Sequence, residues 1–153
     1  MKTFQGSNQN EQIPGLILCS HGPLAIGLLQ SLEMLAGDVP NICAFSLEPG
    51  DDVVQYRQAV VSQLEVYPKG TIIFVDLLGG TPCNQLLQYV QESGKVIEII
   101  TGMNLPIVLN AVLMRQNQKG NDFFLSLIAD GKQSIGRVEL EQLFMDDEDE
   151  DED

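Results

Sequence analysis

Basic residues are scarce in this 153-residue chain, which has eight Lys and Arg residues against 22 Asp and Glu, and a net charge of −14. The cations are spread along the chain, whereas binding to a nucleic-acid backbone needs clustered cations, so we expect no nucleic-acid partner. Eight of the acidic residues form a run at 146–153, without which the net charge of −14 becomes −6. Because such a run repels itself, we expect a disordered acidic tail at 146–153.

Long hydrophobic segments are also lacking. No apolar run approaches the ~20 residues that span a bilayer, and the polar start of the chain lacks the apolar stretch of a signal peptide. The three cysteines (Cys19, Cys43 and Cys83) form no CxxC pair, and each lies in or beside an apolar segment, as reduced core cysteines do. These features predict a cytoplasmic protein.

Several catalytic signatures are absent as well. The chain has one histidine, His21, and the only cysteine close to it is Cys19, whereas a zinc site needs several such ligands. The sequence contains neither the GxxxxGK[ST] loop of P-loop nucleotidases nor the GxSxG elbow of serine hydrolases. We therefore expect no metal ion and no cofactor.

The sequence does contain apolar runs that alternate with helical patterns. Such runs predict buried strands, and strands that are apolar on both faces predict a parallel sheet with helices on both of its faces, the α/β class. Toward the end of the chain, 121–131 could form a short helix and 134–140 a last strand. The four main runs cover 15–20, 41–47, 70–76 and 95–101.

Polar residues follow the predicted strands. In an open α/β sheet, ligands gather at the carboxyl ends of the strands, where the strand order reverses. His21 follows the first strand and Asp76 follows the third, while Glu48–Gly50 and Gly102–Asn104 follow the other two. A strand order of 2-1-3-4 would make His21 and Asp76 neighbours, although the sequence itself does not dictate that order.

An imidazole beside a carboxylate is a known reactive pair. The carboxylate accepts one ring N–H and fixes the tautomer, which leaves the other nitrogen free to attack or to carry a group. The segment GGTPCN (79–84) joins two glycines to a predicted helix start, with Thr81 as N-cap, and HGPLA (21–25) is similar, so both could hold an anion. A lone histidine after a strand is more often structural, and turns need glycine anyway, so these features point to chemistry only in combination.

Three motifs agree in order and spacing with a known family. They are SHGPLAIGLLQSLEMLAG from Ser20, FVDLLGGTPCN from Phe74 and ITGMNLPIVLNAVL from Ile100. On these motifs the chain resembles, over roughly residues 15–140, the IIA components of the mannose family of the bacterial phosphoenolpyruvate-dependent sugar phosphotransferase system (PTS). The resemblance implies four parallel strands in the order 2-1-3-4. It also implies a C-terminal antiparallel strand, here 134–140, that is exchanged between the subunits of a homodimer.

The resemblance divides the chain and assigns its reactive residues. It implies a phosphocarrier domain over 15–145, after a polar N-terminal extension at 1–14. His21 matches the histidine that is phosphorylated on Nε2, and Asp76 matches the aspartate that bonds Nδ1 of that ring. The next residue is a hydroxyl residue in some members but Leu77 here, which puts a second side-chain donor to the phosphate in question.

A glycine-rich loop completes the implied site. Gly79, Gly80 and Thr81 match a Gly-Gly-Ser/Thr-Pro loop that binds the phosphoryl group. Gly22 and Asn104 are weaker candidates that lie near the site.

The activity that the resemblance implies is a phosphoryl relay, a phosphotransferase reaction with a phosphohistidine intermediate. Phospho-HPr would donate to His21, which would pass the group to a IIB component during sugar uptake, with the membrane components IIC and IID served indirectly. A IIA sequence does not encode which sugar is transported or whether IIB is a separate chain. Two alternatives stay open: a regulatory or sensory module phosphorylated on His21 without onward transport, and a non-catalytic dimerisation or ligand-binding module.

Overall fold

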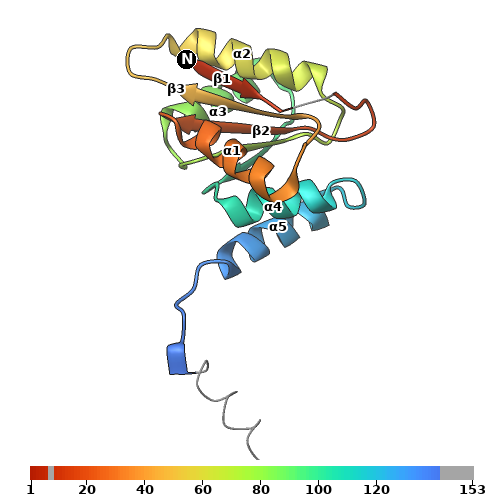
Figure 1. The fold of residues 1–153 in the computed structure, drawn as a ribbon. Helices are drawn as coiled ribbons and strands as arrows, with labels where there is room; N and C mark the ends of the chain where they lie inside the picture. Colours follow the sequence, from red (N-terminus) through yellow and green to blue (C-terminus); the bar gives the residue numbers. More distant parts are fainter. Residues whose placement is uncertain (7–8, 142–153) are drawn as a thin grey trace, which may run out of the picture.

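The computed structural model describes residues 1–6 and 9–141. Strand–helix units follow one another along the chain, as predicted, and the acidic run at 146–153 that is predicted to be disordered lies outside the described residues (Figure 1). No helix in the described ranges is long and apolar enough to cross a membrane. The elements are β1 (Lys2–Gln5), β2 (Leu16–His21), α1 (Leu24–Ala36), β3 (Ile42–Leu47), α2 (Val53–Val66), β4 (Ile72–Val75), α3 (Thr81–Ser93), β5 (Glu98–Thr101), α4 (Leu105–Met114) and α5 (Asn121–Gln133).

The sheet has five strands in the order β1-β3-β2-β4-β5. The last four of these strands are mutually parallel and stand in the 2-1-3-4 order that the resemblance implies. The register pairs His21 with Leu47 on β3 and pairs Cys19 with Val75 on β4. The chain therefore leaves β2 at His21 and β4 at Asp76 on neighbouring strands and at the same edge of the sheet.

The N-terminal segment contains a strand that the sequence did not predict. Residues 1–14 are predicted to be a polar extension, but Lys2–Gln5 forms β1, which pairs antiparallel with β3. The sheet is thus mixed, and its antiparallel strand comes from the start of the chain. The sequence KTFQ is too short and too polar to predict a strand alone. It becomes one because the edge of β3 offers it hydrogen-bond partners.

The C-terminal segment does not form its predicted strand within the single chain. Residues 134–140 are predicted to be a strand, but α5 ends at Gln133 and residues 135–139 are irregular. Figure 1 shows this segment running away from the sheet, and Ile135, Val138 and Leu140 on it are exposed. A strand needs a neighbouring strand for its hydrogen bonds, and this segment pairs with none of the strands in the described ranges.

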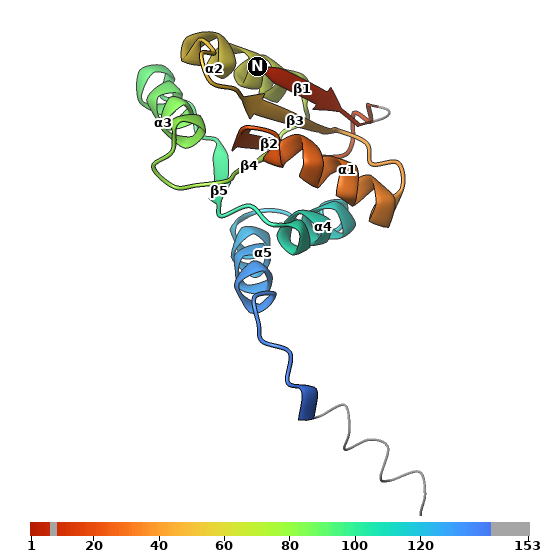
Figure 2. The same ribbon diagram turned by 60° about the vertical axis from the view of Figure 1, so that its left-hand side comes forward.

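Helices cover both faces of the sheet (Figure 2). One core lies between the sheet and α1, α4 and α5 and includes Leu16 and Leu18, and the other lies between the sheet and α2 and α3 and includes Ile17 and Cys19. Because successive strand residues alternate between faces, the end of β2 presents Ser20 toward α1 and His21 toward α3.

Candidate active site

One carboxylate oxygen holds His21 by both its backbone and its ring. The backbone N–H of His21 donates to Asp76 Oδ2 over 2.8 Å, and ring Nδ1 lies 2.9 Å from the same oxygen. A carboxylate only accepts, so Nδ1 carries the hydrogen and Nε2 of the neutral ring keeps a free lone pair. The side chain of His21 is 46% exposed. The site therefore presents an oriented nitrogen nucleophile at the surface.

Asp76 is placed by an extension of the sheet. Its backbone N–H donates to the Cys19 carbonyl over 3.2 Å, which continues the pairing of β2 with β4 by one residue. The Asp76 side chain is 11% exposed, and its second oxygen, Oδ1, is buried without a hydrogen-bond partner among the described residues. Because water screens it poorly, the carboxylate interacts more strongly with the imidazole than an exposed one would.

The loop after Asp76 places the backbone of Gly80 close to the imidazole ring of His21. Gly79 has a φ of 81°, a conformation that favours glycine. A Cβ added at Gly80 would lie 2.5 Å from His21 Cε1 and 3.3 Å from its Nε2. A side chain at Gly80 would thus displace the imidazole, so a glycine is required where the loop passes the ring.

Gly80 is also the N-cap of α3. The prediction that Thr81 is the N-cap is wrong by one residue, because the chain already enters the helix at Thr81. The first N–H groups of a helix lack partners within it and carry partial positive charge. Since Nε2 faces Gly80, an anionic group attached to Nε2 would lie beside the start of α3. The Asn84 side chain donates to the Gly79 carbonyl over 3.0 Å and fixes the loop.

Hydrogen bonds also fix the turn that follows His21. Gly22 has a φ of 56°, and its N–H donates to the Leu47 carbonyl over 2.8 Å. The Ser20 hydroxyl donates to the Gly22 carbonyl over 3.1 Å and accepts from the Ala25 N–H over 2.8 Å. Sequence reasoning assigned Ser20 no role. The available signal was a hydroxyl at the end of an otherwise apolar strand, directly before the histidine.

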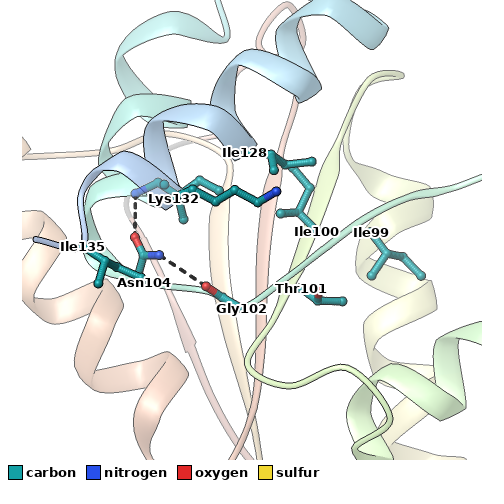
Figure 3. A pocket seen from close by; sticks show the side chains of 10 residues that line it. Ile99, Ile100, Thr101, Gly102, Asn104, Ile128, Lys132 and Ile135 are labelled. Atoms are coloured by element: carbon teal, nitrogen blue, oxygen red, sulfur yellow. Dashed lines mark hydrogen bonds between the residues drawn. The ribbon is translucent and has the colours of Figure 1, made fainter.

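Asn104 has a different position from the other candidates. It is the N-cap of α4, where its Oδ1 accepts from the Ile107 N–H over 3.0 Å and its Nδ2 donates to the Gly102 carbonyl over 3.3 Å (Figure 3). Both ends of its amide are therefore engaged in starting the helix. Asn104 lines a groove together with His21, so it forms a wall of the site.

This groove is apolar and has a volume of about 800 Å³. Leu24 of α1 and Met103 and Leu105 at the start of α4 line it. Leu77 and Leu78, in the loop after Asp76, are 58% and 70% exposed. Exposed apolar surface of this kind around a reactive side chain is typical of a protein-docking site.

The alternative of a zinc site has no support in the part of the chain that the structure describes. That part contains no group of three or more His, Cys, Asp or Glu side chains able to hold a metal ion. Cys19 is fully buried in the core between the sheet and α2 and α3. Burial raises the pKa of its thiol, so Cys19 is not an exposed thiolate that could share a metal with His21.

Comparison with known proteins gives a consistent result. The family model described as the PTS system fructose IIA component (EIIA-man) matches residues 15–128. The fructose-specific EIIA component of Bacillus subtilis is 27% identical over 122 residues, which cover 78% of this chain and 83% of that protein. The mannose-specific EIIAB component of Escherichia coli K12 is 26% identical over 124 residues, 78% of this chain but 38% of that longer protein. The crystal structure of phosphotransferase system component EIIA from Streptococcus agalactiae matches with a TM-score of 0.73 at 27% identity, over 85% of this chain and 99% of that one.

Proposed function

Since the chain belongs to the family of PTS fructose IIA components (EIIA-man), we propose that it carries a phosphoryl group on Nε2 of His21 during sugar uptake. The group is taken from phospho-HPr and passed to a IIB component, and the membrane components are reached only through IIB. The observation that carries the proposal is the pair of hydrogen bonds that Asp76 Oδ2 accepts from His21, one from the backbone N–H and one from ring Nδ1. It leaves Nε2 as the nitrogen that can react.

The reaction is an in-line transfer between two nitrogens. The Nε2 lone pair attacks the phosphorus of the donor, a new N–P bond forms, and the N–P bond of the donor histidine breaks, with its electron pair returning to the donor ring. The His21 ring becomes cationic in this step, and the Asp76 carboxylate stabilises that charge. Transfer to the IIB component is the same step in the opposite sense.

The phosphoryl oxygens are bound by Gly79, Gly80 and Thr81. Their backbone lies at the start of α3, where N–H groups and helix dipole favour an anion. With Leu77 after the aspartate, these N–H groups and the Thr81 hydroxyl replace a second side-chain donor. No metal ion and no nucleotide takes part in this scheme, and a protein in this role works in the cytoplasm.

A homodimer with exchanged C-terminal strands is the second part of the proposal. β5 is an edge strand, and a cavity of about 380 Å³ lies between it and α5 (Figure 3). Ile99, Ile128 and Ile135 line this cavity. The segment 134–140 of a second copy, laid antiparallel along β5, would gain ladder hydrogen bonds and bury its exposed apolar side chains.

Phosphorylation of the purified protein tests the first part. Incubation with phosphoenolpyruvate, enzyme I and HPr should place acid-labile phosphate on the wild-type chain and none on His21→Ala, and a IIB component should then remove the label. An unlabelled wild type, or a labelled His21→Ala, overturns the phosphocarrier function. Label that remains after IIB is added shows a regulatory module instead.

Sedimentation tests the second part. The wild type should sediment as a dimer, and Val138→Asp, which puts a charge on the exchanged strand, should sediment as a monomer. A wild type that is monomeric at the concentrations of the phosphorylation assay contradicts the exchange and leaves the phosphocarrier function standing.

A further inference from the structure

Ser20 is a buried polar residue directly before the reactive histidine. It is 0% exposed, and it lies on the face of the sheet that α1 covers, whereas the ring of His21 lies against Gly80 at the start of α3. Ser20 therefore cannot touch a docking protein or the phosphoryl group. Any effect it has on transfer must pass through its neighbours.

The start of α1 depends on Ser20. Pro23 occupies the N-cap position and has no side chain able to cap a helix. The Ser20 hydroxyl replaces this cap by accepting from the Ala25 N–H over 2.8 Å, and it donates its own proton to the Gly22 carbonyl over 3.1 Å. One hydroxyl thus ties the turn after His21 to the first turn of the helix.

His21 consequently lies between two fixed points. Before it, Asp76 Oδ2 binds its backbone N–H, and after it, Gly22 is held by Leu47 through its N–H and by Ser20 through its carbonyl. A single oxygen of Asp76 can bind the backbone and the ring of His21 together only while that stretch of backbone stays in place. A turn released at Gly22 would lengthen one of the two bonds.

We propose that Ser20 is a positioning residue for phosphoryl transfer. Its hydroxyl holds the turn 21–23 and thereby keeps the imidazole of His21 against Asp76 and Gly80, with Nε2 in the direction of attack. This inference rests on the proposed phosphocarrier function. It differs from a purely structural role because it predicts a specific change in the ring of His21.

The chain offers a matched control. Ser46 lies opposite Ser20 in the register of β2 and β3 and is also 0% exposed. Its hydroxyl, however, has no hydrogen-bond partner among the described residues. Ser20→Ala and Ser46→Ala therefore each remove one oxygen from neighbouring buried positions, but only the first removes bonds to the turn after His21.

The experiment measures phosphorylation by phospho-HPr at varied HPr concentration. Ser20→Ala should lower kcat about tenfold and leave KM for HPr unchanged, because no surface atom is altered. Ser46→Ala should change neither constant. Ser20→Thr, which keeps the hydroxyl, should recover most of the lost kcat. Nitrogen NMR of the one histidine in the chain should show Nδ1 protonated in the wild type and a mixture of tautomers in Ser20→Ala.

Each outcome of these measurements supports or overturns the positioning role of Ser20. A kcat of Ser20→Ala equal to that of the wild type, an equal loss in Ser46→Ala, or a changed KM at constant kcat overturns the positioning role. If the wild type is not phosphorylated at all, the phosphocarrier function fails instead, and the tautomer measurement still tests whether Ser20 orients the ring. If Ser20→Ala does not fold, Ser20→Cys takes its place, because a thiol is only a weak donor and acceptor. A wild-type kcat in Ser20→Cys then rejects the proposal.

Discussion

The two ends of the parallel strands use polar groups in opposite ways. At the carboxyl ends, a carboxylate holds an imidazole that is half exposed. At the amino ends, Arg115 is 3% exposed, and its guanidinium donates to the carbonyls of Pro14 over 2.9 Å, of Asn41 over 3.2 Å and of Pro40. These carbonyls belong to the segments that lead into β2 and β3.

Other bonds at the amino ends serve the main chain too. Asn41, with a φ of 51°, donates from its side chain to the Ile13 carbonyl over 2.6 Å and accepts from the Asn10 N–H over 2.9 Å. Burial lowers the pKa of Arg115 to about 10, which still leaves it cationic at neutral pH. Polar side chains at the amino ends therefore hold the backbone, whereas at the carboxyl ends Asp76 also orients a side chain, the imidazole of His21.

This difference separates stability from reactivity. A substitution at the amino ends should change the free energy of unfolding and leave the activity of the folded protein unchanged. A substitution at the carboxyl ends should change the activity and leave the free energy of unfolding nearly unchanged. Four variants test that separation.

Arg115→Met should have the largest effect on stability. The variant keeps the apolar stem but removes the guanidinium bonds to the half-buried Pro14 and Pro40 carbonyls. The Asn41 carbonyl loses one bond but still accepts from the Leu16 N–H. We expect a loss of about 3 kcal/mol. Urea unfolding measures it, and the kcat for phosphorylation of the folded variant should equal that of the wild type. Arg115→Lys, with a charge but no planar fork, should lose less. A stable Arg115→Met would show that the guanidinium bonds contribute little to folding.

Asp76→Asn should have the largest effect on activity. Loss of the carboxylate removes the charge that stabilises the cationic ring, and the amide NH2 of asparagine can face Nδ1 as a donor and favour the other tautomer, so we expect kcat to fall about 10²-fold. The midpoint of thermal unfolding should hardly change, because the Asp76 backbone bond to Cys19 remains. An unaltered kcat would refute the orienting role of Asp76.

Gly80→Ala should have an intermediate effect at the carboxyl ends. The added Cβ would lie 2.5 Å from His21 Cε1, and the imidazole, as the end of a side chain, is the group that moves. We expect kcat to fall about tenfold, together with a shift of the His21 ring signals in NMR. Wild-type ring signals in this variant would mean that the loop moves to make room for the added Cβ and that the ring stays in place.

Glu98→Gln should have the smallest effect. Glu98 begins β5 at the amino ends, and burial raises the pKa of its carboxyl above the usual range. Ionisation at neutral pH therefore opposes folding, and the glutamine should raise the unfolding temperature slightly at pH 7. The gain should disappear at about pH 3.5, where the carboxyl is protonated in both folded and unfolded states. A gain that persists in acid would point to another cause.

The four parallel strands could be predicted because each lies in a largely apolar run. β1 and the segment 134–140 could not, since a short or mixed segment becomes a strand only when a neighbouring strand is available. The leucine spacing of α1 (Leu24, Leu28, Leu32 and Leu35) predicts one buried stripe, but Leu24 and Leu35 are 50% and 61% exposed. Helical spacing fits more than one face, and the sheet decides which one is buried.

The candidate site, too, could be predicted from the sequence only in part. Sequence position put His21 and Asp76 at strand ends, and the strand order that joins them came from the resemblance to a family. The approach of Gly80 to the ring depends on a contact between separate segments, which no local pattern encodes. The two bonds of Ser20 are local, to Gly22 and Ala25, and a hydroxyl at the end of an apolar strand was the available signal for them.

The first residues of the chain also control the direction in which the sheet can grow. β1 pairs with β3 along Cys43–Ser46 and covers its outer side. β1 is short and carries an exposed lysine, Lys2, and both properties discourage the pairing of a further strand. Addition at both sides of a sheet builds open-ended fibres, whereas mutual addition at one side closes after two copies. β1 thus covers one side of the sheet, and β5 is the edge at which a strand of a second copy could pair.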